Sequence, residues 1–363
     1  MKVALFSSVP YQGAAPRNVW PVASNGFSAD VAQRSMQSAL EQFELADQLG
    51  FDWVTVAEHH YAPLSLTPNP MVMAGALTQR VKRAKIALLG PNIPIQNPVR
   101  VAEEFAMLDV LTGGRIVAGM MRGTSNEYAT YAINPAESRE RFEEALELIL
   151  RAWTEPQPFG WQGRYYEYRT ISIWPKPVQQ PHPPLFMSGS SPESGEFAAR
   201  NRLGLGLAFT TVPLASQAAA YYRQQAAQVG WQPAPDHVLY RLTIHVANTD
   251  DQALDDLKDQ AAPREGFSTS NKQLDEAVAQ AGFYGRDTPT QRARLQAHAL
   301  KERIELGQTL IGSPSTVLKQ IEDIYAKLSA GILDLIFLPT GRDKTLKALE
   351  LFGTKVLPRL RDL

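Results

Sequence analysis

The chain of 363 residues contains no cysteine. This absence excludes a disulfide framework, a thiolate zinc site, an iron–sulfur cluster and a cysteine nucleophile. Charge is balanced, since 36 Lys and Arg against 37 Asp and Glu give −1, so no net field attracts nucleic acid or anionic lipid. No apolar run reaches the ~18 residues of a membrane helix, and the apolar start of the chain is too short for a signal peptide. We expect a soluble, cytoplasmic protein that binds neither nucleic acid nor membrane.

Several fingerprints of common cofactor and nucleophile sites are also missing. The chain has no G-x-G-x-x-G stretch for a dinucleotide and no Walker lysine loop. Gly189 and Ser191 have the spacing that begins a nucleophile elbow, but the elbow's second glycine is absent. These absences argue against nicotinamide, nucleoside triphosphate and serine hydrolase sites of the usual kinds.

Eight apolar runs typical of β-strands alternate with segments of helical spacing. The second, third and fourth runs start about thirty residues apart, which suits a strand–helix unit with a right-handed crossover. This alternation predicts an α/β fold, a (β/α)8 TIM barrel, with an open doubly wound sheet as the alternative. Strands are predicted at 3–6, 53–57, 85–89, 115–120, 184–188, 206–210, 239–247 and 333–338, and helices at 30–49, 70–82, 98–111, 136–153, 193–202, 214–229, 313–330 and 342–361.

Two segments interrupt this alternation. Residues 154–183 are rich in Pro, Trp and Tyr, and Gly163 to Tyr166 predict a surface hairpin. Residues 261–312 are polar with helical spacing. No linker divides the chain, so we predict one domain over residues 1–363 in which these two insertions form a lid and much of the substrate pocket.

A carboxylate and two histidines, Glu58-His59-His60, follow the second predicted strand. The carboxyl ends of barrel strands carry the active site. Consecutive strand residues point to opposite sides, so Glu58 and His60 share one side and His59 takes the other. These residue types also bind metals, but ligand histidines in barrels usually stand at alternate positions, whereas these two are adjacent. We therefore predict general acid–base chemistry and no metal, with a purely structural strand end as the alternative.

A phosphate site is the second hypothesis. Ser190, Ser191 and Ser194 lie where the strand at 184–188 leads into a helix, whose free N–H groups and dipole suit a phosphate. Alone, this stretch is an ordinary serine cap followed by proline. Arg122 follows the strand at 115–120 and Arg139 begins the next helix, and a guanidinium binds a phosphate dianion through two parallel bonds. The two arginines therefore favour the phosphate.

Seven short motifs follow one another along residues 1–205 and 313–360: Ala57-Glu58-His59-His60, Asn97 to Glu104, Leu108 to Arg115, Met121-Arg122-Gly123, Pro175-Lys176-Pro177, Pro183-Pro184 and Gly312-Ser313-Pro314. Each motif alone is weak, and their order makes the pattern specific. In this order they resemble the bacterial luciferase-like flavin monooxygenases.

The resemblance implies a (β/α)8 barrel that binds reduced FMN and uses molecular oxygen to oxidise a small organic substrate. His59 matches the family's catalytic histidine, and Met121 stands where luciferase itself has a reactive cysteine. A cis peptide bond is implied after the strand at 85–89, and the bond between Gly90 and Pro91 is its less costly place. The flavin contacts implied are Glu58, His60, Gly90, Asn92 and Ser190, the last in place of an acidic residue, with Arg122, Arg139, Ser191 and Ser194 on the flavin phosphate.

Partners and alternatives follow from the same residues. Because the chain lacks a nicotinamide fingerprint, reduced flavin is expected from a separate flavin reductase. Helices 70–82 and 98–111 carry apolar residues on more than one side, which predicts a homodimer. The alternative functions are a deazaflavin-dependent hydride-transfer oxidoreductase and a non-catalytic flavin-binding protein; a metal hydrolase is disfavoured. The identity of the substrate does not follow from the sequence.

Overall fold

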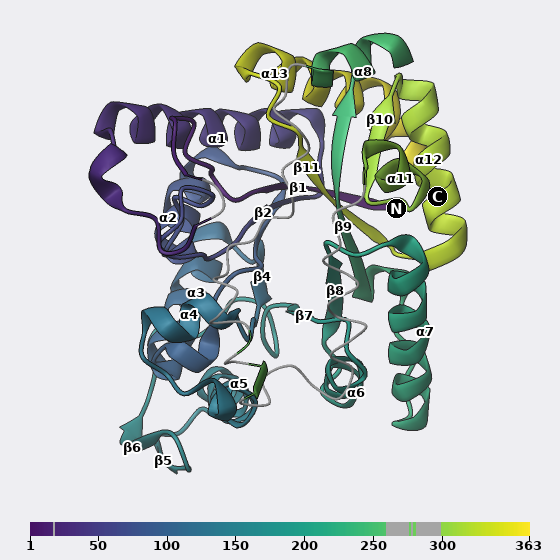
Figure 1. Cartoon of the computed structure of the whole chain (residues 1–363). Helices are drawn as coiled ribbons and strands as arrows, with labels where there is room; N and C mark the ends of the chain where they lie inside the picture. Colours follow the sequence, from purple (N-terminus) through teal and green to yellow (C-terminus); the bar gives the residue numbers. More distant parts are fainter. Residues whose placement is uncertain (17–18, 259–275, 277–278, 281–298) are drawn as a thin grey trace.

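Eight parallel strands close into a barrel in the computed structural model (Figure 1). The structure describes residues 1–16, 19–258, 276, 279–280 and 299–363. The strand order is β1-β2-β3-β4-β7-β8-β9-β11, and β11 pairs with β1 in parallel, which closes the ring. The predicted TIM barrel is confirmed over the open sheet. The strands are β1 (Lys2–Ser7), β2 (Trp53–Val56), β3 (Lys85–Leu88), β4 (Ile116–Gly119), β7 (Leu185–Ser188), β8 (Gly204–Ala208), β9 (Val238–Val246) and β11 (Ile332–Phe337).

Helices surround the barrel, and five of the eight begin at a residue whose side chain caps the first turn. Ser28, Asn69 and Asn97 each accept a bond from the first turn of the helix that follows, as N-caps do. No helix among the described residues is long and apolar enough to cross a bilayer. The barrel helices are α1 (Ala29–Leu49), α2 (Pro70–Arg80), α3 (Pro98–Thr112), α5 (Ser138–Thr154), α6 (Pro192–Arg200), α7 (Val212–Gln228), α12 (Pro314–Leu328) and α13 (Arg342–Leu351).

The shorter elements include two that the sequence did not predict. One is α4 (Ser125–Thr130), between β4 and α5. The other is a π-helical turn, Phe352–Val356, which divides the predicted helix 342–361 into α13 and α14 (Leu357–Leu360). Further short helices in the described residues include α8 (Asp250–Lys258) and α11 (Leu300–Glu305), and single 3-10 turns occur at 24–26, 93–95, 135–137 and 235–237.

The core has two layers, separated by the barrel wall. The larger cluster lies between the strands and the helices. Alternate strand residues point inward and fill the barrel itself, as the two-residue period of a strand requires. This interior cluster contains Ala4, Trp53, Ala87, Leu89, Val117, Phe186, Leu239 and Ile332.

The first predicted interruption contains a surface hairpin, as expected. Strands β5 (Phe159–Gln162) and β6 (Glu167–Ile171) pair antiparallel, and the turn between them includes Gly163. Glu144 of α5 accepts bonds from the backbone N–H of Arg164, Tyr165 and Tyr166, which fixes the turn on that helix.

The second predicted interruption, 261–312, lies largely outside the described residues. Its last four residues are the strand β10 (Thr309–Gly312). β8 pairs with β9 from Val238 to Arg241, and β10 then pairs with it from Thr243 to Val246. The sequence did not predict this strand, because four residues within polar sequence give no periodicity that marks them.

The peptide bonds around Gly90 differ from the expectation. Among the described residues, cis bonds precede Pro21, Pro175 and Pro181, whereas the bond from Gly90 to Pro91 is trans. Trans is the more stable form even before proline. The glycine itself is needed, because a Cβ at this position would lie 2.3 Å from the backbone nitrogen of Glu58.

Candidate functional site

The polar residues predicted to act together come from neighbouring strands of the ring. β2, β3, β4 and β7 are consecutive in the barrel, so the loops that follow them share one edge of its mouth. The loops after β3 and β4 continue the pairing, because Asn92 and Met121 form an additional parallel bridge. This bridge brings the segment after Gly90 against the segment that leads to Arg122.

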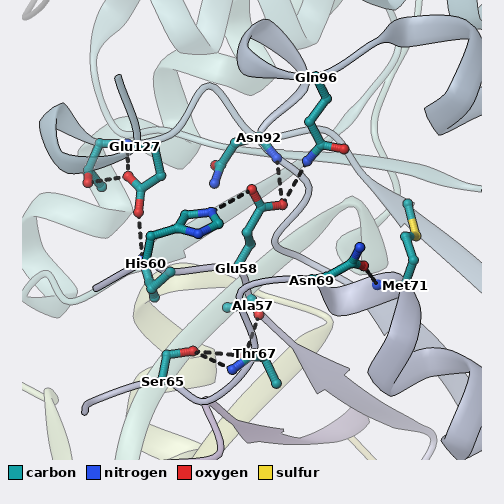
Figure 2. Close-up of polar contacts among 12 residues, drawn as sticks. Ala57, Glu58, His60, Ser65, Thr67, Asn69, Met71, Asn92, Gln96 and Glu127 are labelled. Atoms are coloured by element: carbon teal, nitrogen blue, oxygen red, sulfur yellow. Dashed lines mark hydrogen bonds and ion pairs between the residues drawn. The ribbon is translucent and has the colours of Figure 1, made fainter. Parts of the chain in front are cut away.

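The carboxylate of Glu58 is buried and accepts bonds on both oxygens. Its Oε1 lies 3.1 Å from His60 Nε2, and its Oε2 accepts bonds from the backbone N–H of Asn92 at 3.3 Å and from Gln96 Nε2 at 2.8 Å. Figure 2 shows Glu58 between His60 on one side and Asn92 and Gln96 on the other. Glu58 and His60 share one side, as their spacing predicts. Glu58 thereby ties the loop after β2 to the loop after β3.

His59 pairs with a different carboxylate, that of Glu127 in α4. His59 Nδ1 lies 3.1 Å from Glu127 Oε1, and the backbone N–H of Thr124 donates to Glu127 Oε2 at 2.7 Å. The hydroxyl of Thr124 donates to the same oxygen. Burial of Glu127 opposes its ionisation, but the bonds from His59 and Thr124 outweigh it and hold the pKa of that carboxyl below its usual value.

Accessibility separates His59 from the groups around it. The side chain of His59 is 29% exposed, whereas the side chains of Glu127, Glu58 and His60 are each at most 4% exposed. A buried carboxylate that holds an accessible imidazole fixes its ring and its tautomer. Within this set, His59 is the group that can exchange a proton with a bound molecule.

The sequence analysis missed Glu127 and Gln96. Glu127 could have been found, because Thr124-Ser125-Asn126-Glu127 has the spacing of a helix capping box and begins two residues after Arg122. Gln96 has no such signal, since its amide reaches Glu58 only through the fold.

The predicted phosphate residues lie on adjacent elements. Ser191 caps α6, and its Oγ accepts a bond from the backbone N–H of Ser194 at 3.3 Å and lies 3.1 Å from Ser194 Oγ. Helices α5 and α6 touch through Phe142 and Phe197, whose ring centroids are 5.5 Å apart. Arg139 and Ser194 each precede these rings by three residues, so they lie one turn nearer the start of each helix. Ser190 belongs to the loop that leads into α6.

The two arginines differ in their surroundings. Arg122 Nη1 lies 3.5 Å from Ser138 Oγ, and the Arg122 carbonyl accepts a bond from the Tyr128 hydroxyl. Arg139 is half-buried, and in the part of the chain that the structure describes no hydrogen bond or ion pair engages its guanidinium. A half-buried guanidinium with no acceptor is suited to an anion from outside the chain.

A second unsatisfied donor belongs to the loop after β3, next to Gly123. Asn92 is buried, and its Nδ2 has no hydrogen-bond partner. A buried donor without a partner costs about 1–3 kcal/mol, so such groups usually meet a ligand or water. Gly123 passes close to the same side chain, with φ +87°, where a Cβ would lie 3.1 Å from Asn92 Oδ1. Asn92 Nδ2 is therefore a donor that a bound ligand or water can satisfy.

Metal ligands do not converge in the described residues, where no group of three or more His, Asp or Glu side chains is placed to hold an ion. The acidic and histidine side chains at the mouth form two separate pairs instead, Glu58 with His60 and Glu127 with His59. The arrangement therefore suits proton transfer.

Relatives of the chain include several monooxygenases. The chain is 27% identical over 347 residues to 4-hydroxyprotoasukamycin monooxygenase of Streptomyces nodosus subsp. asukaensis, covering 90% of this chain and 87% of the relative. It is also 27% identical to the oxygenase component of flavin-dependent trigonelline monooxygenase from Acinetobacter baylyi, covering 45% of each chain. Several relatives are matched over only about half of their own length.

Solved structures share the fold along nearly the whole chain. The oxygenating constituent of 3,6-diketocamphane monooxygenase from Pseudomonas putida, in complex with FMN, superposes with a TM-score of 0.75 at 19% identity, covering 99% of this chain and 98% of that one. An F420-dependent secondary alcohol dehydrogenase superposes with a TM-score of 0.68 at 19% identity, covering 99% of each chain. A sequence model described as luciferase-like monooxygenase matches residues 19–330. The chain therefore belongs to the luciferase-like monooxygenase family.

Proposed function

We propose that the protein is a flavin-dependent monooxygenase that uses reduced FMN and molecular oxygen to oxidise a small organic substrate. Family membership and the flavin-dependent relatives support this choice. The observation that carries it is the accessible His59 held by buried Glu127, because a proton-transfer group at the barrel mouth is what the chemistry needs from the protein.

Different residues would bind the phosphate and the flavin ring of FMN. Arg139, Arg122 and the first turn of α6 at Ser191 and Ser194 offer positive charge and N–H donors to the phosphate. Asn92 offers its unsatisfied amide to a polar edge of the flavin. Glu58, His60, Gly90 and Ser190 complete the predicted contacts. When bound, reduced FMN supplies the electrons that activate oxygen.

His59 has a separate role, which is to hold and deliver protons. Its ring is fixed through Nδ1 by Glu127, so Nε2 is the nitrogen left to exchange a proton with the substrate or the cofactor. Glu127 acts through His59, and Thr124 in turn orients Glu127.

The source of reduced flavin is a second part of the proposal. The trigonelline relative is named as an oxygenase component, which fits an enzyme that receives reduced flavin from another protein. We infer that this chain likewise works with a separate flavin reductase.

A binding comparison tests the proposed cofactor. Purified protein is titrated anaerobically with reduced FMN and with a reduced deazaflavin, and absorbance spectra are then followed after oxygen is added. We expect reduced FMN to bind more tightly, and the protein to change the course of its reaction with oxygen. Tight binding of the deazaflavin alone would favour the hydride-transfer alternative, and FMN binding with no effect on the oxygen reaction would favour a non-catalytic protein.

The predicted homodimer has a candidate surface on α2 and α3. These two helices pack on each other, and both expose large apolar side chains. A monomer rarely exposes such a patch without a use for it. The exposed fractions are 72% for Val72, 52% for Met107, 46% for Val110 and 54% for Leu111.

We expect light scattering at micromolar concentration to give twice the chain mass of 40.1 kDa. The double substitution Val72→Glu and Leu111→Glu should convert the dimer to a monomer, because it buries unpaired charge in the interface. Val229→Glu is the matched control, since Val229 is 48% exposed but lies at the end of α7. A wild-type protein that is only monomeric contradicts the prediction.

A further inference from the structure

A row of polar side chains continues along the inner face of β9 toward the barrel mouth. Leu239 belongs to the interior cluster, and strand residues two apart share a face, so Arg241, Thr243 and His245 follow on the same face. The Arg241 side chain points into the barrel, because its Nε donates to the buried carboxylate of Asp334 at 2.7 Å. That ion pair neutralises the charge of Arg241 inside the barrel.

Arg303 of α11 brings another positive charge to this face. Its Nη2 donates to Thr243 Oγ1 at 3.1 Å. The helix is held in place by Leu300 and Ile304, which pack against a small apolar cluster that includes Ile311 of β10. The packing of Leu300 and Ile304 thus holds Arg303 against the face of β9.

The charge of Arg303 is not compensated by the described part of the chain. The residue is half-buried, and burial lowers the pKa of Arg303 without an acidic group among the described residues to oppose it. A guanidinium has five N–H donors and stays protonated, and a hydroxyl occupies one of the five. Several donors on a partly dehydrated cation therefore remain for an anion.

The polar groups next to Arg303 are satisfied within the protein or lack a partner. Thr243 Oγ1 lies 2.7 Å from Thr309 Oγ1 and 3.3 Å from the carbonyl of Gln308, so its proton is already used within the protein. His245 is buried, with Nε2 on Asp256 at 3.0 Å and with no partner for Nδ1. The face thus combines an uncompensated cation with a buried nitrogen that lacks a partner.

This face lies across the mouth from the residues assigned to FMN. In the closed ring, β9 is four strands away from β3 in either direction, and the proposed flavin contacts follow β2, β3, β4 and β7. A substrate that meets a flavin held on one side of the mouth would occupy the other side. Arg303 is therefore placed to meet the substrate.

We propose that Arg303, positioned by Thr243, binds a carboxylate group of the substrate, so that the substrate class is a small organic acid. The identification as a substrate site rests on the proposed function, whereas the preference for an anion at Arg303 does not. A guanidinium matches a carboxylate through two parallel hydrogen bonds, which a neutral group of the same shape cannot form.

Matched pairs of acids and amides test the proposal by calorimetry. The probes are benzoate and benzamide, phenylacetate and phenylacetamide, and octanoate and octanamide, each titrated into the protein without flavin and with FMN. We expect at least one acid to bind about 10- to 100-fold more tightly than its amide, the range of charge-assisted hydrogen bonds. Arg303→Gln should abolish this preference, and Arg303→Lys should keep part of it.

Lys301→Gln is the control, because it removes the same charge from the same helix at a side chain that is 89% exposed. It should leave the preference unchanged, and circular dichroism should show equal melting for all variants. No acid preference in the wild type for any pair, or a preference that Arg303→Gln retains, overturns the proposal. Acid binding without FMN binding would refute the proposed function but leave the anion site at Arg303 intact. FMN binding without an acid preference would refute the anion site but leave the proposed function intact.

Discussion

His59→Ala should lower turnover by roughly 10²–10⁴-fold while FMN binding weakens much less. The expected size is that of a general acid–base group removed from its reaction. The effect should fall on catalysis because Glu127 holds His59 by one nitrogen and leaves the other for proton exchange. The measurement is product formed per unit time with reduced FMN in excess, together with FMN affinity by equilibrium dialysis.

Glu127→Gln provides the companion measurement. The amide oxygen can still accept a bond from His59, but the charge beside the imidazole is lost. We expect a smaller loss of turnover than for His59→Ala, because the oxygen that orients the imidazole ring is kept. Near-normal oxidation by His59→Ala would remove His59 from the proposed reaction.

FMN should bind about 10- to 100-fold more tightly than riboflavin, which lacks the phosphate. The difference corresponds to about 1.5–3 kcal/mol, the contribution of charge-assisted hydrogen bonds. Arg122→Ala should cost that amount in FMN affinity and remove most of the preference. Arg139→Gln should act in the same way, since its half-buried guanidinium has no acceptor within the described chain. Riboflavin affinity should change little in either variant, as measured by fluorescence titration.

Arg141→Gln is the matched control for this measurement. Arg141 belongs to the same helix, α5, but its Nε is already bound to Glu137 at 2.9 Å, so its loss should leave FMN affinity unchanged. Equal affinities of the wild type for FMN and riboflavin would refute the phosphate assignment.

The barrel could be predicted from sequence because its signals are local and repeated. Each of the eight strands is an apolar run followed by a helix, and residues such as Ser28, Asn69 and Asn97 mark where several of these helices begin. β10 gave no such signal. It has only four residues. It is stabilised by pairing with β9, which lies more than sixty positions earlier in the chain.

The candidate site also has one part that local sequence signals predict and another that depends on the fold. The alternation of strand residues correctly predicted that Glu58 and His60 share a side. The partners of these residues depend on distance in space. Gln96 and Glu127 reach them from the loops after β3 and β4, and the only local sign of either was the spacing from Thr124 to Glu127.

The change of partner along β9 has a consequence for how the family can vary. The chain leaves β9 at Val246 and returns in β10 at Thr309, so both ends of the intervening segment are fixed on one pair of strands. Lengthening a segment between fixed ends costs little, about 0.6 kcal/mol for each doubling. The ring closes through β8, β9 and β11, and the pairing of these strands includes no residue of the intervening segment. Evolution, or an engineer, can exchange residues 259–305 as a cassette and retain the barrel, whereas Leu306, Gly307 and Gln308 stay because they accept bonds from α7 and β9.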